Sequence, residues 1–295
     1  MNSDNLITTF CNIDDFCMKF EPDWHATLLS SQTGKRNKKR NLSLSEIMAI
    51  LIFFHSSGMK TFKQYYVLFI FSFGHLFKNL VSYNRFVELI PTALIPLCSF
   101  LEFSKGECTG LSIIDSTPLI VCHNKRIFDH KVFDGIAKRG KSTMGWFFGF
   151  KLHIIINQMG ELLAFKLTPG NVSDSKMIEP LSGGLFGKLF GDKGYLNQKL
   201  FRKMLKKGLQ IVTQIRSNMK NKLMDYTDRI TLRKRSLVES VFHVFKDILN
   251  MDHTRHRSPV NFMTNLVAGL AAYCLSDKKP RMRMEHNTSG NLVLA

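Results

Sequence analysis

The chain has 295 residues, of which 44% are hydrophobic, so a real core can be buried and wholesale disorder is excluded. It carries 41 Lys and Arg against 23 Asp and Glu, which gives a net charge of +18 and a pI near 9.7. Such an excess favours a polyanionic partner, nucleic acid first and an acidic membrane surface second. The six cysteines form no CxxC pair, so neither a zinc ribbon nor a redox motif is indicated.

The N-terminal third is predicted to be helical. Residues 1–34 are expected to be weakly structured or peripheral, and the run KRNKKR (35–40) is either a solvated segment or a phosphate-contacting arm. The capping box SLSE (43–46) opens a helix to about His55. A second helix covers the aromatic stretch 65–77, which is shorter than the ~20 residues of a membrane span.

A third helix is expected from residue 82, so residues 1–104 are assigned to an N-terminal all-helical, DNA-binding module. Helix, short turn, helix is compatible with a helix-turn-helix reader. Because the second helix is too apolar to lie wholly in a groove, simple packing is the favoured interpretation of that pair.

After residue 104 the pattern changes to strands. Apolar runs predict strands over 111–121, 146–157 and 162–168, the last two joined by a hairpin turn. Helices and strands then alternate at 174–181, 187–192, 197–208, 209–216, 236–250 and 260–275. This order predicts an α/β fold with a ribonuclease H-like mixed sheet flanked by helices, over residues 105–276. Residues 277–295 are expected to be a disordered tail.

Two aspartates follow apolar residues at strand ends. Asp115 lies in IIDS, where a carboxylate among Ile residues is costly unless it is paired or binds a cation. Asp192 lies between two glycines in LFGDKGYLNQ, where a simple turn is the alternative. Adjacent strands can bring the two together, and a metal ion then relieves their repulsion. Mg²⁺ is typically held by one or two carboxylates and substrate phosphate.

A third carboxylate is expected from the helix 236–250. Arg235, Glu239 and Lys246 are separated by four and seven residues, which places them within about 40° of one another around an α-helix. Glu239 can then point at the aspartates while the two cations reach phosphates. Taken alone, this pattern is better explained by an ordinary surface helix with salt bridges. Combined with the two aspartates, it favours a third carboxylate at the same site.

These residues resemble the DDE transposases of bacterial insertion sequences, of the insertion-sequence family 982 type. The resemblance spans nearly the whole chain, most strongly IIDSTPLIVCHNKRI, GWFFGFKLHIIIN, LTPGNVSDSK, GDKGY and RKRSLVESVFHVFK. It places the acidic triad of the family on Asp115, Asp192 and Glu239, and its R-x3-E-x6-K signature on Arg235, Glu239 and Lys246. The Tyr that many relatives carry three residues before the Arg is Leu232 here.

The resemblance implies cleavage of DNA at insertion-sequence ends and transfer of the cut strand into target DNA, without a covalent protein–DNA bond. Two Mg²⁺ ions, or Mn²⁺ in their place, are expected about 3.5–4 Å apart between Asp115, Asp192 and Glu239. The implied partners are double-stranded DNA, as terminal inverted repeats and as target, and a second copy of the chain in a homodimer, with no membrane. The N-terminus has no signal-peptide pattern, so a cytoplasmic, nucleoid-associated location is expected.

Other polar residues receive weaker assignments. Lys193 and the KRGK cluster (Lys138, Arg139, Lys141) are candidate phosphate contacts, with solvated loop charge as an equal alternative. Asp174 is expected to cap a helix. Ser116 and Tyr195 are expected to pack or to contact DNA, and the histidines to be core or surface residues.

Three alternatives to a transposase remain at this point. A ribonuclease H-like endonuclease would cut DNA without joining it, and the triad cannot separate the two. A DNA-binding repressor with an inactive site would favour an altered triad, but all three acids are present. A membrane-surface protein would favour a basic amphipathic helix, whereas the most basic stretches here are loops and a helix of mixed charge.

Overall fold

The computed structural model describes residues 3–30, 41–142, 144–214, 224–252, 256–282, 284–286 and 292–294. The KRNKKR run and His253 therefore lie outside the described residues. The chain divides into two compact units: Met1–Ser104 with Phe245–Ser276, and Lys105–Val244 with Asp277–Ala295. The N-terminal and C-terminal thirds of the chain thus contribute to the same unit.

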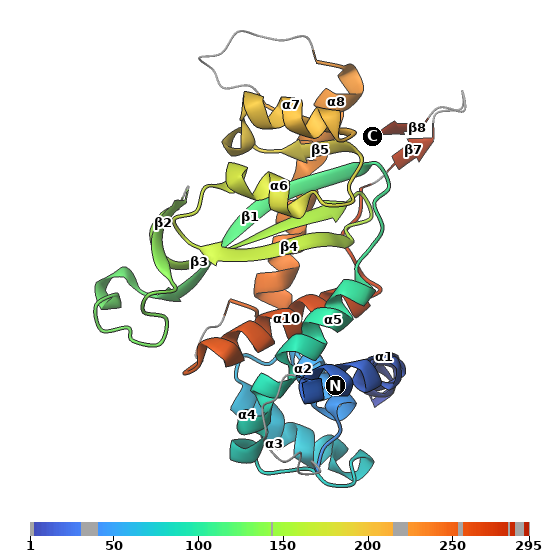
Figure 1. Cartoon of the computed structure of the whole chain (residues 1–295), viewed down its shortest axis with the longest axis vertical. Coiled ribbons are helices and arrows are strands. Elements are labelled where there is room, and N and C mark those ends of the chain that lie inside the picture. The colour runs from blue at the N-terminus through green and yellow to red at the C-terminus, as the bar shows by residue number, and fades with distance from the viewer. Residues whose placement is uncertain are drawn as a thin grey trace. The chain divides into compact units, whose positions relative to one another are not determined.

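The first unit is built from helices, coloured blue, cyan and red-orange in Figure 1. Its described elements are α1 (Ser3–Ser30), α2 (Leu44–Ser56), α3 (Phe62–Phe73), η1 (Gly74–Leu76), α4 (Tyr83–Leu89), η2 (Ile90–Ala93), α5 (Leu94–Ser104) and α10 (Pro259–Leu275). The expected capping box begins α2: the Ser43 hydroxyl accepts from the Glu46 amide at 3.0 Å, and the Ser43 amide donates to the Glu46 carboxylate at 2.7 Å.

The first 30 residues differ from the prediction of weak structure. They form α1, which contacts α2 and buries Leu6, Ile13 and Cys17. These side chains are spaced by seven and four residues, a spacing that places them on one face of a helix. Because Ile7 and Met18 are exposed outside this face and polar residues lie between them, average composition did not reveal the buried face.

Helix α10 also differs from the domain boundaries that we predicted. We assigned 260–275 to the catalytic domain, but α10 packs against α2 and α5 of the helical unit. Its consecutive buried residues, Leu266 to Tyr273, show why: the helix is apolar on nearly every side and requires neighbours all round.

One helical run among the described residues, 83–104, is long and apolar enough by composition to cross a membrane, with a mean hydropathy of 1.6. It buries Phe86, Leu97 and Phe100 within the helical unit. A core helix passes the same test of length and composition, and these buried side chains favour that interpretation.

The second unit contains a mixed sheet. Its strands are β1 (Leu111–Cys122), β2 (Lys138–Ser142), β3 (Gly145–Asn157), β4 (Leu162–Pro169), β5 (Gly187–Gly191) and β6 (Leu209–Thr213). β1 is antiparallel to β3 and parallel to β5, and β5 is parallel to β6. β2 and β4 both pair antiparallel with β3, β2 with its first residues and β4 with the residues that follow. The predicted mixed sheet flanked by helices is confirmed.

One strand agrees with the prediction and one differs from it. β1 covers the predicted run 111–121 and includes Pro118, where β5 no longer pairs with it, so the missing N–H of proline breaks no ladder bond to β5. The KRGK segment is β2, paired with β3, and not the loop that we expected.

Helices cover both faces of the sheet. One face packs on η4 (Asp174–Met177), α6 (Ile178–Leu181) and α7 (Gln198–Lys206), through a core that includes Ile114, Ile155, Leu189 and Tyr195. The opposite face of β1 contacts α9 (Leu237–His243), part of the orange helical segment behind the sheet in Figure 1. This double cover explains why Ile113 and Ile114 are both fully buried.

The helical segment 226–248 is less regular than the single helix that we predicted over 236–250. It consists of α8 (Tyr226–Arg233), η6 (Lys234–Ser236), α9 and the π-helical η7 (Val244–Ile248). A π-turn adds a residue per turn, so the angle of 100° per residue does not extend from Glu239 to Lys246. Lys246 moreover belongs to the helical unit, whereas Arg235 and Glu239 belong to the sheet unit.

The tail also differs from the prediction of disorder, since Met284–His286 (β7) pairs antiparallel with Leu292–Leu294 (β8). The run NLVLA supplies the β-branched and apolar residues that favour such pairing.

Candidate active site

Asp115 and Asp192 follow the paired part of two neighbouring parallel strands. The last register pair of β1 and β5 is Ile113 with Phe190, two residues before Asp115 and Asp192 respectively; Asp115 lies within β1 and Asp192 directly follows β5. Gly187 helps to fix this register, because it has φ +81 and a side chain there would collide with the backbone of Gly110. The charge of Asp192 contributes to the raised pKa of Asp115, so the two carboxylates lie within electrostatic range of each other.

Asp115 is held from both sides. Its Oδ1 accepts from the Ser116 amide at 2.8 Å, and its Oδ2 accepts from Arg235 Nη1 at 2.7 Å. The pKa of Asp115 is nevertheless raised to about 6, mainly by burial and in smaller part by the charge of Asp192, against the lowering effects of Arg235 and the Ser116 amide. A carboxyl whose charge is this costly gains from a nearby cation.

Glu239 lies one helical turn beyond Arg235. Its Oε1 is 3.9 Å from Arg235 Nη2, so one guanidinium links Asp115 and Glu239. The Glu239 side chain is 67% exposed and can turn, whereas that of Asp115 is only 20% exposed. Among the described residues no three Asp, Glu, His or Cys side chains are grouped closely enough to hold a metal ion.

The donor chemistry of this site still fits a divalent ion. Asp115 and Asp192 supply hard oxygen ligands from adjacent strands, and each Asp115 oxygen keeps a lone pair beyond the hydrogen bond that it accepts. Glu239 can add a third carboxylate after a side-chain rotation. Arg235, which we predicted to contact phosphate, contacts two of the acids in this structure.

Asp174 lies beside the site, but not as the helix cap that we predicted. Ser173, and not Asp174, precedes the short helix as its cap residue. Asp174 Oδ1 instead accepts from the Ser116 hydroxyl at 2.9 Å and from Lys151 Nζ at 3.2 Å. It therefore joins the loop after β4 to the residue that follows Asp115.

His153 completes this cluster. Its Nδ1 lies 3.7 Å from Asp174 Oδ1, and its Nε2 is 2.9 Å from the Thr168 hydroxyl. Burial lowers the pKa of His153 to about 4, so the ring is neutral at physiological pH. The signal in the sequence was Lys151 and His153 at alternate positions of the apolar run GWFFGFKLHIIIN, which places two polar side chains on one face of β3.

Tyr195 separates the core from the acids. It is buried in the cluster with Ile114 and Leu189, and its hydroxyl has no hydrogen-bond partner among the described residues. Burial raises its pKa well above the ordinary value, and the charges of Asp115 and Asp174 act in the same direction. A neutral, buried phenol is consistent with packing, not with a nucleophile.

The other predicted basic residues lie at different distances from the acids. Lys193 directly follows Asp192 and is exposed. Lys138, Arg139 and Lys141 are exposed on β2, which pairs with Gly145–Gly149 of β3. Asp115 pairs with Ile154, five residues further along β3, or about 17 Å. β2 is therefore not in contact with the carboxylates.

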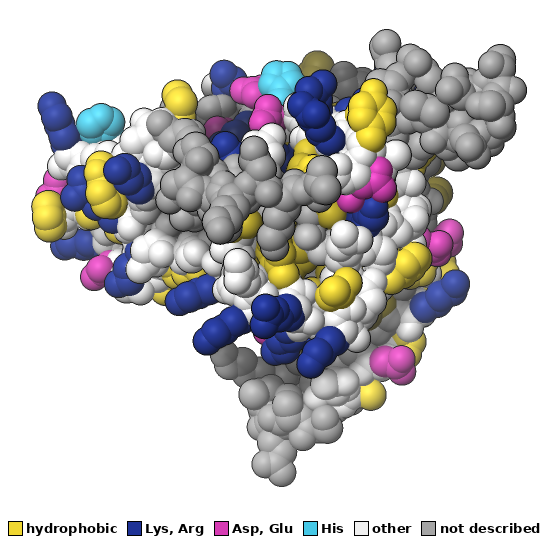
Figure 2. Space-filling model, turned by 90° about the horizontal axis from the view of Figure 1, so that it is seen from above, with side chains coloured by type: hydrophobic (Ala, Val, Ile, Leu, Met, Phe, Trp, Pro, Cys, Tyr) yellow, Lys and Arg dark blue, Asp and Glu magenta, His cyan; other side chains and the backbone are white. Residues whose placement is uncertain are grey.

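The β2 cations lie beside an aromatic ring. The Arg139 guanidinium is 5.1 Å and the Lys141 ammonium 5.8 Å from the centre of the Trp146 ring, which is itself exposed. On the face in Figure 2, basic side chains in dark blue recur across the surface, with few acidic ones between them. Such a surface suits a polyanion.

Comparison with solved structures gives only a weak similarity. The chain is similar to the protein in "Crystal structure of the Mos1 Strand Transfer Complex", with 12% identity, a TM-score of 0.26, and coverage of 86% of this chain and 83% of that one. A similarity at this TM-score carries no argument. No curated protein matches the sequence.

The family comparison is decisive. The family model described as "Transposase DDE domain" matches residues 105–259, more than half of the 295 residues. The matched segment contains Asp115, Asp192, Glu239 and the elements that carry them. The chain belongs to the transposase DDE domain family.

Proposed function

We propose that the protein is a transposase that cleaves DNA at the ends of an insertion sequence and joins the cut strand to target DNA, with Asp115, Asp192 and Glu239 as its catalytic carboxylates. The observation that carries the proposal is that paired parallel strands lead to Asp115 and Asp192, whose charges interact, within a domain of the transposase DDE family. The strand order and directions further support a ribonuclease H-like fold for this domain.

Divalent metal ions, Mg²⁺ or Mn²⁺, would be held by Asp115 and Asp192 with Glu239 as third ligand. Such ions supply activation of an attacking oxygen and stabilisation of a leaving oxygen. The chain itself orients Asp115 through the Ser116 amide and Arg235. Arg235 and the exposed Lys193 offer donors to phosphodiester oxygens beside the acids. Lys246 is proposed as a further phosphate contact.

The finer assignments are proposals of the same kind. The DNA partners are the terminal repeats and the target duplex, the active species is a homodimer, and the location is cytoplasmic, at the nucleoid. The ordered sequence stretches support the insertion-sequence family 982 type. The helical unit is proposed to bind DNA, and this unit comprises residues 1–104 together with 245–276.

Cleavage of a labelled duplex that carries the terminal repeat tests the proposal. In Mg²⁺ the wild type is expected to nick at the repeat end, and Asp192→Asn is expected to lose at least about 10³-fold in rate. Asp134→Asn, an exposed aspartate of the same unit, is the matched control and should cleave normally. Binding measured in EDTA should be equal for all three proteins, since the substitutions spare the basic surface.

A second readout separates the proposal from its alternatives. Joining of the precut end to a supercoiled plasmid distinguishes a transposase from an endonuclease that only cuts. Specific binding with no cleavage in Mg²⁺ or Mn²⁺ would instead identify a DNA binder with an inactive site. An Asp192→Asn protein that cleaved like the wild type would contradict the assigned carboxylates.

A further inference from the structure

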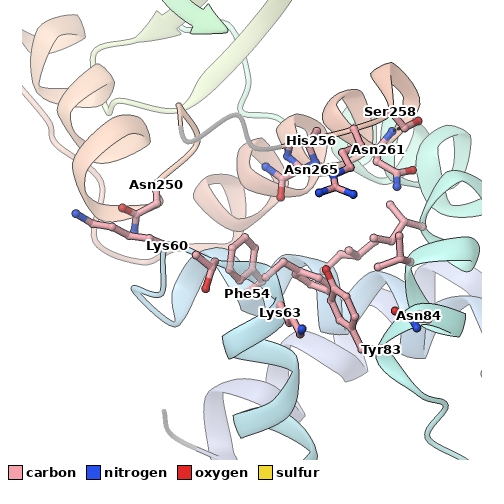
Figure 3. A pocket seen from close by; sticks show the side chains of 16 residues that line it. Phe54, Lys60, Lys63, Tyr83, Asn84, Asn250, His256, Ser258, Asn261 and Asn265 are labelled. Atoms are coloured by element: carbon pink, nitrogen blue, oxygen red, sulfur yellow. Dashed lines mark hydrogen bonds between the residues drawn. The ribbon is translucent and has the colours of Figure 1, made fainter. Parts of the chain in front are cut away.

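The helical unit contains a pocket that the proposed chemistry does not use. Its volume is about 690 Å³, and its walls come from the end of α2, the start of α3, α4, Asn250 and the segment 256–265. Figure 3 shows His256, Asn261 and Asn265 on one side, with Phe54 and Tyr83 opposite them. The volume lies within the roughly 300–1,000 Å³ of small-ligand sites, so one nucleotide fits and a duplex does not.

The charged side chains that line the pocket are all basic. Lys60, Lys63 and Arg257 line it, and no Asp or Glu does. None of the three forms an ion pair with a carboxylate in the part of the chain that the structure describes. Unpaired cations around a concave surface attract an anion, and phosphate is the anion that Arg and Lys bind best.

Two helix N-termini strengthen this field. α3 has 12 residues and begins beside Thr61 and Lys63, with no side chain capping its first amides. α10 has 17 residues and begins beside Arg257 and Ser258. The positive ends of both helix dipoles, and the uncapped first N–H groups of α3, add to the three cations in favouring a phosphate group; α10 begins with Pro259 and is capped by the Ser258 hydroxyl, so it contributes mainly its dipole.

The rest of the wall suits a nucleobase. Phe54, Phe62 and Tyr83 provide aromatic surface, with ring centres 5.2 Å apart for Phe54 and Phe62 and 6.4 Å apart for Phe62 and Tyr83. Unstacked bases bind to such aromatic faces irrespective of their sequence.

Amide side chains add hydrogen-bonding groups to the aromatic surface. Four of them line the pocket: Asn84, Asn250, Asn261 and Asn265. Asn261 Oδ1 is buried and has no hydrogen-bond partner among the described residues. A buried acceptor without a partner is costly, and the amino or ring N–H of a base supplies the missing donor.

We propose that this pocket binds a single nucleotide extruded from the DNA duplex, with its phosphate at Lys60, Lys63 and Arg257 and its base between the aromatic and amide walls. The inference rests on the proposed function only in taking DNA as the partner. It assigns to the helical unit the recognition of unpaired DNA, in addition to contacts with the duplex.

The test compares two duplexes that differ only in one unpaired central thymidine. Affinity of the full chain is measured by fluorescence anisotropy in EDTA, so that cleavage plays no part. The wild type is expected to prefer the bulged duplex by about tenfold, the magnitude of one stacked base. Asn261→Leu and Lys63→Gln should bring this ratio close to one. Lys78→Gln, an exposed lysine of the same unit outside the pocket, should leave it unchanged.

Three results would overturn the inference. The first is a wild-type ratio of one, and the second is a ratio that survives both pocket substitutions. The third is a protein that shows no preference for the bulge but from which micromolar free thymidine 5′-monophosphate displaces the labelled duplex. That result would assign the pocket to a free nucleotide.

The two proposals can fail separately. A protein that cleaves repeat ends in Mg²⁺ but shows no preference for the bulge refutes the pocket alone. A protein that prefers the bulged duplex but does not cleave repeat ends refutes the catalytic proposal alone.

Discussion

Asp115 is expected to make cleavage dependent on pH. Its pKa is raised to about 6, first by burial, so without metal the carboxyl takes up a proton as the pH falls through 6. Metal ligands must be deprotonated, so the apparent affinity for Mg²⁺ should fall about tenfold per pH unit below 6. Cleavage rates at a fixed, subsaturating Mg²⁺ concentration between pH 5 and 8 measure this. A flat profile across that range would contradict the assigned pKa.

The same residue is expected to lower the stability of the metal-free protein. A folded pKa of about 6 against an ordinary 3.8 means that the folded state binds the proton more tightly than the unfolded state. Stability is therefore lost as the pH rises through this window, by about 3 kcal/mol when complete. Asp115→Asn should raise the free energy of unfolding by about 1–3 kcal/mol at pH 8 in EDTA. Urea denaturation should show a smaller gain at pH 5.

Asp174 and Lys151 form an ion pair in which both side chains are largely buried. Asp174→Ala leaves the Lys151 ammonium without its carboxylate and should cost about 3–5 kcal/mol, the usual cost of breaking a buried pair. Lys151→Met added to Asp174→Ala should recover part of the loss. Urea denaturation of the two single variants and the double variant gives the coupling energy, and additive losses would show that the pair is not coupled.

Strand β2 carries the basic residues that we propose to contact DNA away from the reacting atoms. Lys138, Arg139 and Lys141 are exposed, and the latter two flank the Trp146 ring. Each phosphate contact contributes about 0.9 to the slope of log K against log salt. Replacing all three with Gln should reduce that slope by up to about 2.7. Duplex binding between 50 and 300 mM NaCl measures the slope, and an unchanged value would place β2 outside the DNA interface.

How much could be predicted differs from element to element. The neighbourhood of Asp115 and Asp192 was predictable because residues near the ends of parallel strands meet at one edge of a sheet. The role of Asp174 was not, because its partners Ser116 and Lys151 lie 58 and 23 residues away. The π-turn of η7 could not be predicted either, because tertiary packing and not local propensity selects it.

At the scale of the whole molecule, the helical unit is discontinuous in sequence. α10 packs on α2 and α5, and its removal would expose their apolar surface. A fragment of residues 1–104 is therefore expected not to fold cooperatively, whereas 1–104 joined by a short linker to 245–276 should. Circular dichroism during thermal unfolding separates the two fragments, and a sharp transition for 1–104 alone would contradict the expectation.

This arrangement has a consequence for protein synthesis. A ribosome makes residues 105–244, which form most of the sheet unit, before it makes α10, so the helical unit becomes whole only late in synthesis. Damaged gene copies with a stop codon anywhere before Pro259 would then yield products without a finished helical unit. Under the proposed role of the helical unit in DNA binding, such products would not occupy repeat ends, and accumulated truncated copies would not compete with the intact protein.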